Sequence, residues 1–235
     1  MDITIMSFNT LHCMNYLTHK IDYDIMAETI KNCGADIVGL QEMRDECDAK
    51  GYEAQTKILA EKLGFYYYFA QAILLDGTKP YGNAIISRYP ILSAETVMIP
   101  DPEVRQYSGY YETRCLAKAT VDVGGGLTVM ASHFGLNLDE RENAVATAVA
   151  NIADRRCVLM GDFNMTPDND LLDPIRERMY DTAEKFTEPK LSFPADAPTM
   201  KLDYIFATKD MVVKSADIPA IVASDHRPYV ATFEI

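Results

Sequence analysis

Several polar residues with catalytic potential lie at the ends of apolar, strand-like runs. Asn9 follows 3–8, Gln41-Glu42 ends 36–42, and His133 follows 127–132. Strand ends in a layered sheet protein converge on one rim, where ligand sites are commonly built, so we expect these side chains to meet. The candidates with such a position are Asn9, Glu42, His133, Asp162, Asn164, Asp203, Asp225 and His226.

The oxygen-bearing members of this set are suited to a hard cation. Glu42, Asp225 and the amide of Asn9 offer the oxygen ligands that Mg²⁺ prefers, with Mn²⁺ as an alternative. The chain has no His-x-x-x-His pair and no cysteine cluster that would favour zinc. The residue types therefore predict a magnesium site.

The remaining members suit proton transfer and the positioning of water. Asp162 and Asn164 lie two residues apart, so both point the same way if that segment is extended. An acceptor beside an amide can orient one water molecule for attack. His226 and Asp203 form a plausible carboxylate–imidazole pair, in which the acid fixes the tautomer and supports a charged ring.

Each residue taken alone also has a purely structural explanation. Glu42 is then a solvated carboxylate at a strand end, and Asp162 or Asn164 a turn residue that bonds its own backbone. An isolated histidine is more often structural than catalytic, and Asp203 caps the segment that follows it. Six such coincidences at six strand ends favour a shared site.

The apolar pattern predicts one mixed α/β domain over residues 1–235, without a linker or an internal repeat. A Gly124-Gly125-Gly126 turn predicts a hairpin, and the three prolines in 186–200 predict a loop. The expected helices are 23–33, ended by Gly34, 55–63, ended by Gly64, and one that includes 145–152. The expected strands are 3–8, 36–42, 65–69, 83–87, 91–99, 116–123, 127–132, 157–161, 202–208 and 228–235.

Bulk properties restrict the class of protein. The 235 residues are 48% hydrophobic and carry a formal charge of −13, which disfavours non-specific binding to nucleic acid, although a bound cation can reverse the local field. The five cysteines include no Cys-x-x-Cys pair, so a reducing compartment is expected. No signal peptide is visible, and no run approaches the roughly 18 apolar residues of a membrane helix. We therefore expect a soluble cytoplasmic protein.

Seven short motifs, in their order along the chain, resemble those of the endonuclease/exonuclease/phosphatase superfamily, which has the deoxyribonuclease I-like fold. Gly-Asp-Phe-Asn and Ser-Asp-His-x-Pro are moderate signals individually, and the ordered set is strong. The motifs are Met6-Ser-Phe-Asn-Thr10, Leu40-Gln-Glu42, Gly82-Asn-Ala-Ile-Ile-Ser-Arg88, Ala131-Ser-His133, Gly161-Asp-Phe-Asn164, Leu202-Asp-Tyr-Ile-Phe206 and Ser224-Asp-His-Arg-Pro228.

The resemblance implies a four-layer sandwich of two packed mixed β-sheets flanked by helices, with the catalytic rim at one edge. It also implies a metal-dependent phosphoesterase in which water attacks phosphorus in line, without a covalent intermediate. Glu42 is similar to the principal metal ligand, with Asn9 and Asp225 completing or adjoining the metal site.

The resemblance gives the other candidates roles in the reaction. Asp162 and Asn164 match the pair that positions and activates water. His226, oriented by Asp203, matches the histidine that contacts the scissile phosphate or moves a proton. The general base is either Asp162 or His226. The two remaining assignments are His133, which assists the leaving group or binds phosphate, and Arg114, a phosphate contact.

Departures from the better-known subfamilies bear on the substrate. The chain has no Trp, and it has Pro80-Tyr-Gly-Asn-Ala where the apurinic-site endonucleases carry a different pattern. It has Asp203-Tyr-Ile where the inositol-polyphosphate phosphatases carry another pattern. It resembles instead a bacterial metal-dependent hydrolase branch. We expect a small or lipid-linked phosphodiester or phosphomonoester as substrate, with a nuclease as the alternative. A non-catalytic interaction module ranks lower, because Glu42, Asp162 and His226 are all present, and no protein partner is implied.

Overall fold

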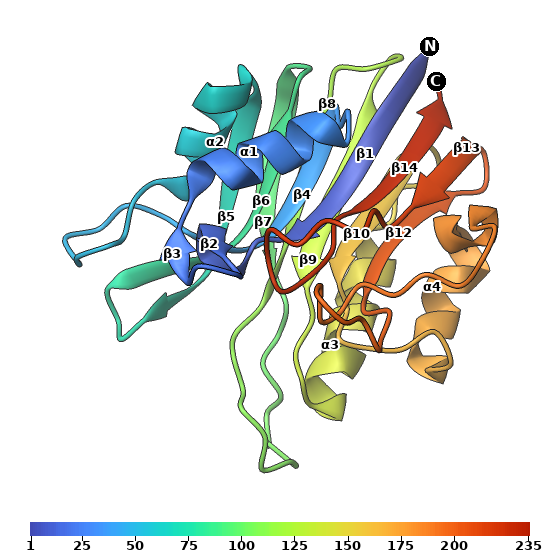
Figure 1. Cartoon of the computed structure of the whole chain (residues 1–235). Helices are drawn as coiled ribbons and strands as arrows, with labels where there is room; N and C mark the ends of the chain where they lie inside the picture. The colour runs from blue at the N-terminus through green and yellow to red at the C-terminus, as the bar shows by residue number, and fades with distance from the viewer.

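Two six-stranded mixed sheets form the centre of the computed structural model, which describes residues 1–235 (Figure 1). The first sheet has the order β13-β14-β1-β4-β6-β5, in which β1 and β4 run parallel and the other neighbours antiparallel. Its strands are β1 (Asp2–Asn9), β4 (Ile37–Arg44), β5 (Tyr66–Leu75), β6 (Lys79–Ser87), β13 (Val212–Asp217) and β14 (Tyr229–Glu234).

The second sheet has the order β11-β12-β10-β9-β8-β7, in which only β9 and β10 run parallel. The predicted hairpin at the glycine turn is confirmed, since β8 and β9 pair antiparallel across it. The strands of this sheet are β7 (Ile91–Met98), β8 (Cys115–Val121), β9 (Leu127–His133), β10 (Cys157–Asp162), β11 (Met179–Asp181) and β12 (Asp203–Thr208).

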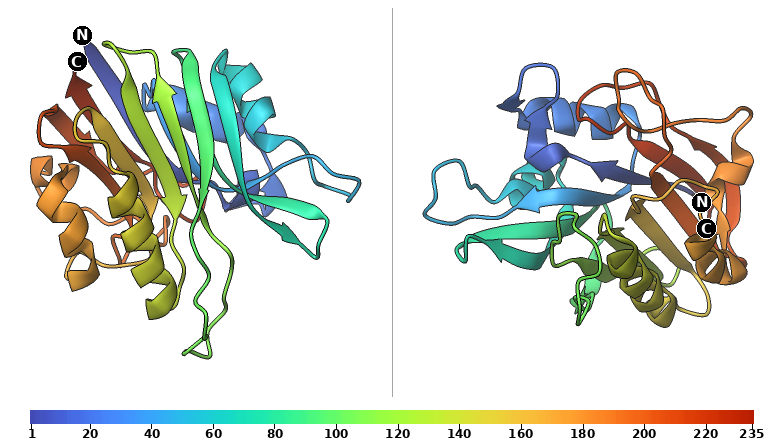
Figure 2. Two further views of the ribbon diagram at one scale, coloured as in Figure 1. Left: turned by 180° about the vertical axis from the view of Figure 1, so that it is seen from behind. Right: turned by 90° about the horizontal axis from the view of Figure 1, so that it is seen from below.

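Helices cover the outer face of each sheet (Figures 1 and 2). Helices α1 (Tyr23–Asn32) and α2 (Gln55–Leu63) pack on the first sheet, and α3 (Leu138–Asn151) and α4 (Asp173–Arg178) on the second. Short 3-10 turns are η1 (Leu11–Cys13), η2 (Asp170–Leu172) and η3 (Thr182–Lys185), and β2 (Met14–Asn15) pairs with β3 (Lys20–Ile21). None of the helices has both the length and the apolar character needed to cross a membrane.

Three apolar cores hold the layers together. The largest lies between the two sheets and includes Ile5, Ile85, Val129 and Phe233. The other two lie between each sheet and its helices, so the predicted four-layer sandwich is confirmed. The sheets approach closely beside Gly39 of β4, where an added Cβ would lie 2.8 Å from the Cβ of Ala131. This position therefore has no room for a side chain.

Most of the expected elements are present, with differences at the edges. The strand expected at 65–69 continues to Leu75, and the strand expected at 83–87 already begins at Lys79. The two strands therefore form one long hairpin. The helix expected around 145–152 begins earlier, at Leu138, after a capping box of Asn137 and Glu140. Strand β13 and helix α4 were not predicted. Strand β13 is an edge strand with a bulge and mixed exposure, so its sequence lacks the alternation of a buried strand.

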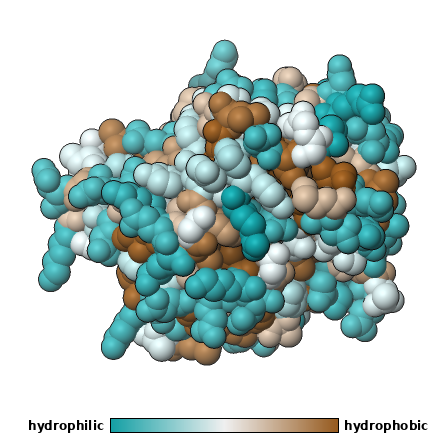
Figure 3. All heavy atoms as spheres, turned by 90° about the horizontal axis from the view of Figure 1, so that it is seen from above, coloured by the Kyte–Doolittle hydropathy of each residue, from teal (hydrophilic) through white to brown (hydrophobic).

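The strand directions bring the polar candidates to one edge. The parallel strands β1 and β4 end there, as do β9 and β10, and the antiparallel strands β12 and β14 begin there. Asp162 is directly opposite His133 on one side and Asp203 on the other. The chain termini lie at the opposite edge, whose surface in Figure 3 is mostly hydrophilic with scattered apolar patches.

Candidate active site

Asn9 joins the polar groups of the two sheets. Its Nδ2 donates to Oε1 of Glu42 at 3.0 Å, within the first sheet, and to Oδ2 of Asp162 at 3.2 Å, in the second. The Asn9 amide oxygen accepts from the backbone N–H of Leu11 at 3.1 Å. The expected convergence of distant strand ends is therefore present, whereas the metal-ligand role of Asn9 stays a prediction. In this arrangement its amide nitrogen, and not its oxygen, faces Glu42.

Glu42 lies inside β4 rather than at a strand end, which corrects the position expected from the sequence. Its φ is +62°, in the left-handed region, and the pairing of β4 with β6 shifts register between Leu40 and Met43. Bulges of this kind redirect a side chain, and a strained non-glycine backbone is found most often at functional sites. Burial raises the pKa of Glu42, the Asn9 hydrogen bond lowers it, and Asp225 raises it again.

Asp162 is the centre of the cluster. Its Oδ2 lies 3.4 Å from Nε2 of His226 and 3.5 Å from Nε2 of His133, in addition to the Asn9 amide. The carboxylate is almost fully buried, and burial raises its pKa to about 6 although His226 acts in the opposite direction. One carboxylate oxygen thus accepts a hydrogen bond from Asn9 and lies within 3.5 Å of both histidine rings, so groups from both sheets meet at it.

His226 is held between two carboxylates. Its Nδ1 lies 2.8 Å from Oδ2 of Asp203, and its Nε2 faces Asp162. Burial alone would lower the pKa of His226, but the two carboxylates raise it to about 10. The predicted carboxylate–imidazole pair is therefore present, and the ring carries a proton on both nitrogens at neutral pH.

Asn164 departs from the expected geometry. The segment after β10 is not extended, because Asn164 has a φ of +52° and its backbone N–H donates to Oδ1 of Asp162 at 3.0 Å. This is the tight turn considered as the structural explanation of the pair. The turn places the Asn164 side chain against His133, since Nδ2 of Asn164 lies 3.1 Å from Nε2 of His133 and 3.0 Å from the Phe134 carbonyl.

His133 and Arg114 form a second chain of contacts. Nη1 of Arg114 lies 3.1 Å from Nδ1 of His133 and 2.6 Å from Oε1 of Glu112. A guanidinium only donates, so Nδ1 of His133 is the acceptor. Burial and Arg114 hold the pKa of His133 well below its usual range. The ring is therefore neutral at pH 7, with its Nε2 3.1 Å from Nδ2 of Asn164 and 3.5 Å from Oδ2 of Asp162.

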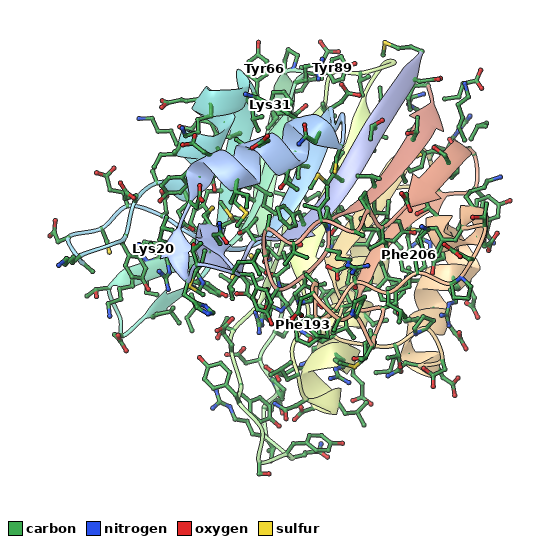
Figure 4. All side chains as sticks on the ribbon, in the orientation of Figure 1. Lys20, Lys31, Tyr66, Tyr89, Phe193 and Phe206 are labelled. Atoms are coloured by element: carbon green, nitrogen blue, oxygen red, sulfur yellow. The ribbon has the colours of Figure 1, made fainter.

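Three site residues were missed by the sequence reasoning. Glu112 forms an ion pair with Arg114, and the ring of Phe193 lies 4.8 Å from that of His226. Tyr81 lies beside Glu42, and its pKa is raised first by burial and then by Glu42 and Glu112. Figure 4 labels Phe193 at the same edge of the sheets, far from Tyr66 and Tyr89 at the edge of the termini. The opposite charges of Glu112 and Arg114, two residues apart, were a usable signal, whereas the contacts of Tyr81 and Phe193 depend on distant segments.

The donor set fits a hard divalent cation. The Glu42 and Asp225 carboxylates interact repulsively, and no basic side chain forms an ion pair with either. No group of three or more His, Cys, Asp or Glu side chains is arranged to hold an ion. Mg²⁺ and Mn²⁺ are bound through one or two carboxylates with water and phosphate oxygens, whereas zinc needs three or four protein ligands. The residues present thus fit Mg²⁺ or Mn²⁺.

A family model and solved structures match nearly the whole chain. The model of the Endonuclease/Exonuclease/phosphatase family matches residues 6–226. An endonuclease/exonuclease/phosphatase from Beutenbergia cavernae is 20% identical, with a TM-score of 0.80, over 100% of this chain and 72% of that one.

Two further structures have names that state an activity. A mannosyl-6-phosphatase from Bacteroides thetaiotaomicron is 18% identical, with a TM-score of 0.77, over 99% of this chain and 100% of the other. A 2′,3′-cyclic phosphatase in complex with adenosine-2′,3′-vanadate is 16% identical, with a TM-score of 0.75, over 99% and 95%. At these sequence identities, the similarity to the solved structures shows a shared fold alone.

Proposed function

Because the chain belongs to the endonuclease/exonuclease/phosphatase family, we propose that it is a divalent-metal-dependent phosphoesterase that hydrolyses a small or lipid-linked phosphate ester with directly attacking water. The observation that carries this proposal is the shared carboxylate of Asp162. Asn9, His133 and His226 converge on its Oδ2 from two sheets. A buried carboxylate among neutral and charged donors can accept a proton from water and keep it close to the reacting phosphate.

Asp162 is the better candidate for the general base. His226 lies between Asp203 and Asp162, so both ring nitrogens face carboxylates and neither is free to accept a proton. As an imidazolium, His226 is instead suited to stabilise negative charge on a phosphoryl oxygen. Asp203 would keep this ring oriented and charged, and Asn164 would help to position the water that Asp162 deprotonates.

His133 and Arg114 are suited to bind the phosphate. The His133 ring lies between Nη1 of Arg114 and Nδ2 of Asn164, each 3.1 Å from one of its nitrogens. Its low pKa keeps the ring neutral, which suits a neutral contact with phosphate better than the role of an acid for the leaving group. Nε of Arg114 is buried and has no hydrogen-bond partner. A phosphoryl oxygen would satisfy such a donor, because unpaired buried N–H groups are costly.

Glu42 and Asp225 would hold the metal ion, close to the phosphate site. When bound, Mg²⁺ would neutralise negative charge on the phosphoryl and leaving oxygens, which stabilises the transition state by several kcal/mol. Glu42 reaches this position through the bulge in β4, and its hydrogen bond from Asn9 keeps it near Asp162. Both carboxylates have to be ionised for this role.

The acidic surface supports a substrate of low charge. A formal charge of −13 opposes the approach of a long polyanion, which gains affinity by counterion release to Lys and Arg. The names of two relatives, a mannosyl-6-phosphatase and a 2′,3′-cyclic phosphatase, are in line with a small phosphate ester. A nuclease is the second candidate, since the family description includes endonucleases and exonucleases.

A substrate panel tests the proposal. Bis-p-nitrophenyl phosphate, p-nitrophenyl phosphate, a phosphorylated lipid and plasmid DNA are incubated with the protein in Mg²⁺ or EDTA. We expect Mg²⁺-dependent hydrolysis of at least one substrate, lost in Glu42→Ala and His226→Ala variants that remain folded. Asp36→Ala, at the opposite end of β4, is the control and should retain activity.

Three results would count against parts of the proposal. Activity that is equal in EDTA and Mg²⁺ would contradict metal dependence. Activity that survives in both Glu42→Ala and His226→Ala would contradict the assigned site. Exclusive cleavage of DNA, with binding that weakens steeply as salt increases, would favour the nuclease.

A further inference from the structure

Arg44 is half-buried, and its guanidinium has no hydrogen bond or ion pair within the protein. It lies two residues after Glu42 at the end of β4. No carboxylate lies within ion-pair distance of the Arg44 guanidinium, and its Nε is buried without a hydrogen-bond acceptor. The chain contains 35 acidic residues against 22 basic ones, so a carboxylate partner would be easy to supply. The missing partner therefore calls for a physical explanation.

The position of Arg44 is fixed by its neighbours. Its guanidinium carbon lies 4.8 Å from the centre of the Tyr52 ring, a cation–π contact. The side chain of Gln55 accepts from the Arg44 backbone N–H at 2.9 Å and donates to the His12 carbonyl at 2.7 Å. Arg44 is therefore preorganised rather than a mobile surface side chain.

The backbone beside Arg44 is strained. Leu11, His12 and Cys13, which follow Asn9 closely, have φ values of +47°, +47° and +60°. Left-handed backbone is unfavourable for a non-glycine residue and is concentrated at functional sites. Burial lowers the pKa of His12 to about 4, with Arg44 acting in the same direction. The histidine is thus neutral at pH 7, and Arg44 is the cation of this corner.

Arg44 lies next to the proposed metal site. It is opposite Tyr81 in the register of β4 and β6, and Tyr81 is the residue whose hydroxyl lies beside Glu42. The β5–β6 hairpin, from which Tyr81 comes, projects from the body of the protein on this side (Figure 1). Tyr81 is thus a neighbour of both residues, which makes Arg44 a candidate contact for a ligand that extends from Glu42 past Tyr81.

The energetics favour a ligand over a structural role. A half-buried charge without a partner loses hydration and gains no ion pair, which is unfavourable. The other arginine without a hydrogen bond or ion pair is Arg105, which stacks on Tyr111 but is exposed, so water solvates it. Arg44 has less access to water. Its planar fork matches the two oxygens of a phosphoryl group.

We propose that Arg44, held on Tyr52, binds a second phosphoryl group of the substrate, so that the preferred substrates are small molecules with two phosphoryl groups. This inference rests on the proposed hydrolysis of a phosphate ester at the Glu42 site. The ester phosphate would lie among His133, His226 and Arg114, and the second group would lie beyond Tyr81 on Arg44. Binding at two points explains how an acidic protein could select a small molecule with two phosphoryl groups over one with a single group.

Calorimetry with non-hydrolysable probes tests this inference. Alkane bisphosphonates with two to six methylene groups between the phosphorus atoms are compared with propylphosphonate, at equal Mg²⁺ in cell and syringe. For the wild type, we expect the best-fitting bisphosphonate to bind at least about tenfold more tightly than the monophosphonate. In Arg44→Gln this ratio should fall to about twofold or less, and Arg44→Lys should be intermediate because it keeps the charge but loses the planar fork.

Two further variants control the experiment. Arg105→Gln removes a tyrosine-stacked arginine elsewhere and should keep the wild-type ratio. Tyr52→Leu keeps the Arg44 charge but removes its support and should reduce the ratio, which gives a second test if Arg44→Gln does not fold.

The results separate this inference from the proposed function. A wild-type ratio near one would overturn the inference, even when the substrate panel shows metal-dependent hydrolysis. A ratio that depends on Arg44 would support the subsite, even when no substrate of the panel is cleaved. If Arg44→Gln weakens binding of a single-stranded oligonucleotide but leaves the bisphosphonate ratio unchanged, the arginine serves nucleic acid and the inference is wrong.

Discussion

His226 and Asp203 are joined by a 2.8 Å contact between Nδ1 and Oδ2, although they belong to different halves of the sandwich. Asp203 begins β12 in the second sheet, and His226 precedes β14 in the first. Both groups are buried, so water does not weaken the interaction. The pair therefore links the two sheets and, in the proposed mechanism, keeps an imidazolium next to the phosphate.

Replacing Asp203 by Asn should separate orientation from charge. The amide would keep the size of the side chain but could no longer stabilise a charged ring. We expect kcat for the best substrate of the panel to fall on the order of 10²-fold or more, with a smaller change in KM. Asp36→Asn, the same change at the opposite end of β4, should leave kcat unchanged. An Asp203→Asn variant with wild-type kcat would exclude the role given to this pair.

Replacing Glu42 by Gln should weaken the metal site. The amide keeps the shape of the side chain but loses the charge that a divalent cation requires. The Mg²⁺ concentration for half-maximal activity should rise by at least about tenfold, and calorimetry should show the same loss of Mg²⁺ affinity without substrate. Mg²⁺ binding that is unaltered by the substitution would place the ion elsewhere.

Replacing Asn9 by Asp should make the site electrostatically unfavourable in the absence of metal. The new carboxylate would lie within hydrogen-bond distance of both Glu42 and Asp162, where the amide now donates to each. We expect a loss of about 1–3 kcal/mol in the free energy of unfolding in EDTA. Mg²⁺ should restore more stability in the variant than in the wild type. Equal melting temperatures in EDTA would contradict the observed bridging role.

Lys201 should make stability depend on pH above neutrality. Burial lowers the pKa of Lys201 to about 8, from a usual 10.5, although Asp181 and Asp203 raise it, and its Nζ lies 3.3 Å from the Tyr204 ring centre. Between these two pKa values the unfolded chain binds a proton that the folded chain does not. The free energy of unfolding therefore rises with pH in this window.

Chemical denaturation of the wild type and of Lys201→Met measures this effect. From pH 8 to 9.5, wild-type stability should increase by about 2 kcal/mol relative to the variant. Below pH 8 the difference between the two proteins should become constant. A difference that does not change with pH across the window would show that Lys201 titrates normally.

Much of the fold could be predicted because its central strands are continuous apolar runs. The segment 3–8 was recognised by its alternation, 127–132 from the glycine turn before it, and 157–161 as a short buried run, and all three are largely buried in the structure. Strand β13 was missed because edge strands are stabilised by pairing and not by burial of their side chains. The predicted cytoplasmic location stays a prediction.

The composition of the site could be predicted more easily than its geometry. Asn9, Glu42, Asp162 and His226 were all expected at one rim, and the structure brings them together. The left-handed backbone of Glu42 could not be expected, since Leu40-Gln-Glu-Met-Arg44 contains no glycine or proline to mark a bulge. Such conformations are imposed by tertiary packing and leave no local signal.

The close packing at Gly39 also affects the geometry of the candidate site at the rim. Because Gly39 has no side chain, β4 can lie close to Ala131 of β9. Gly39 therefore helps to set the distance between the two sheets. Glu42 follows three residues later on the same strand, and His133 follows Ala131 by two. A change in this interior gap would shift the opposing groups past one another at the rim. In the proposed mechanism, the relative position of Glu42 and His133 thus depends partly on the packing of the buried core between the sheets.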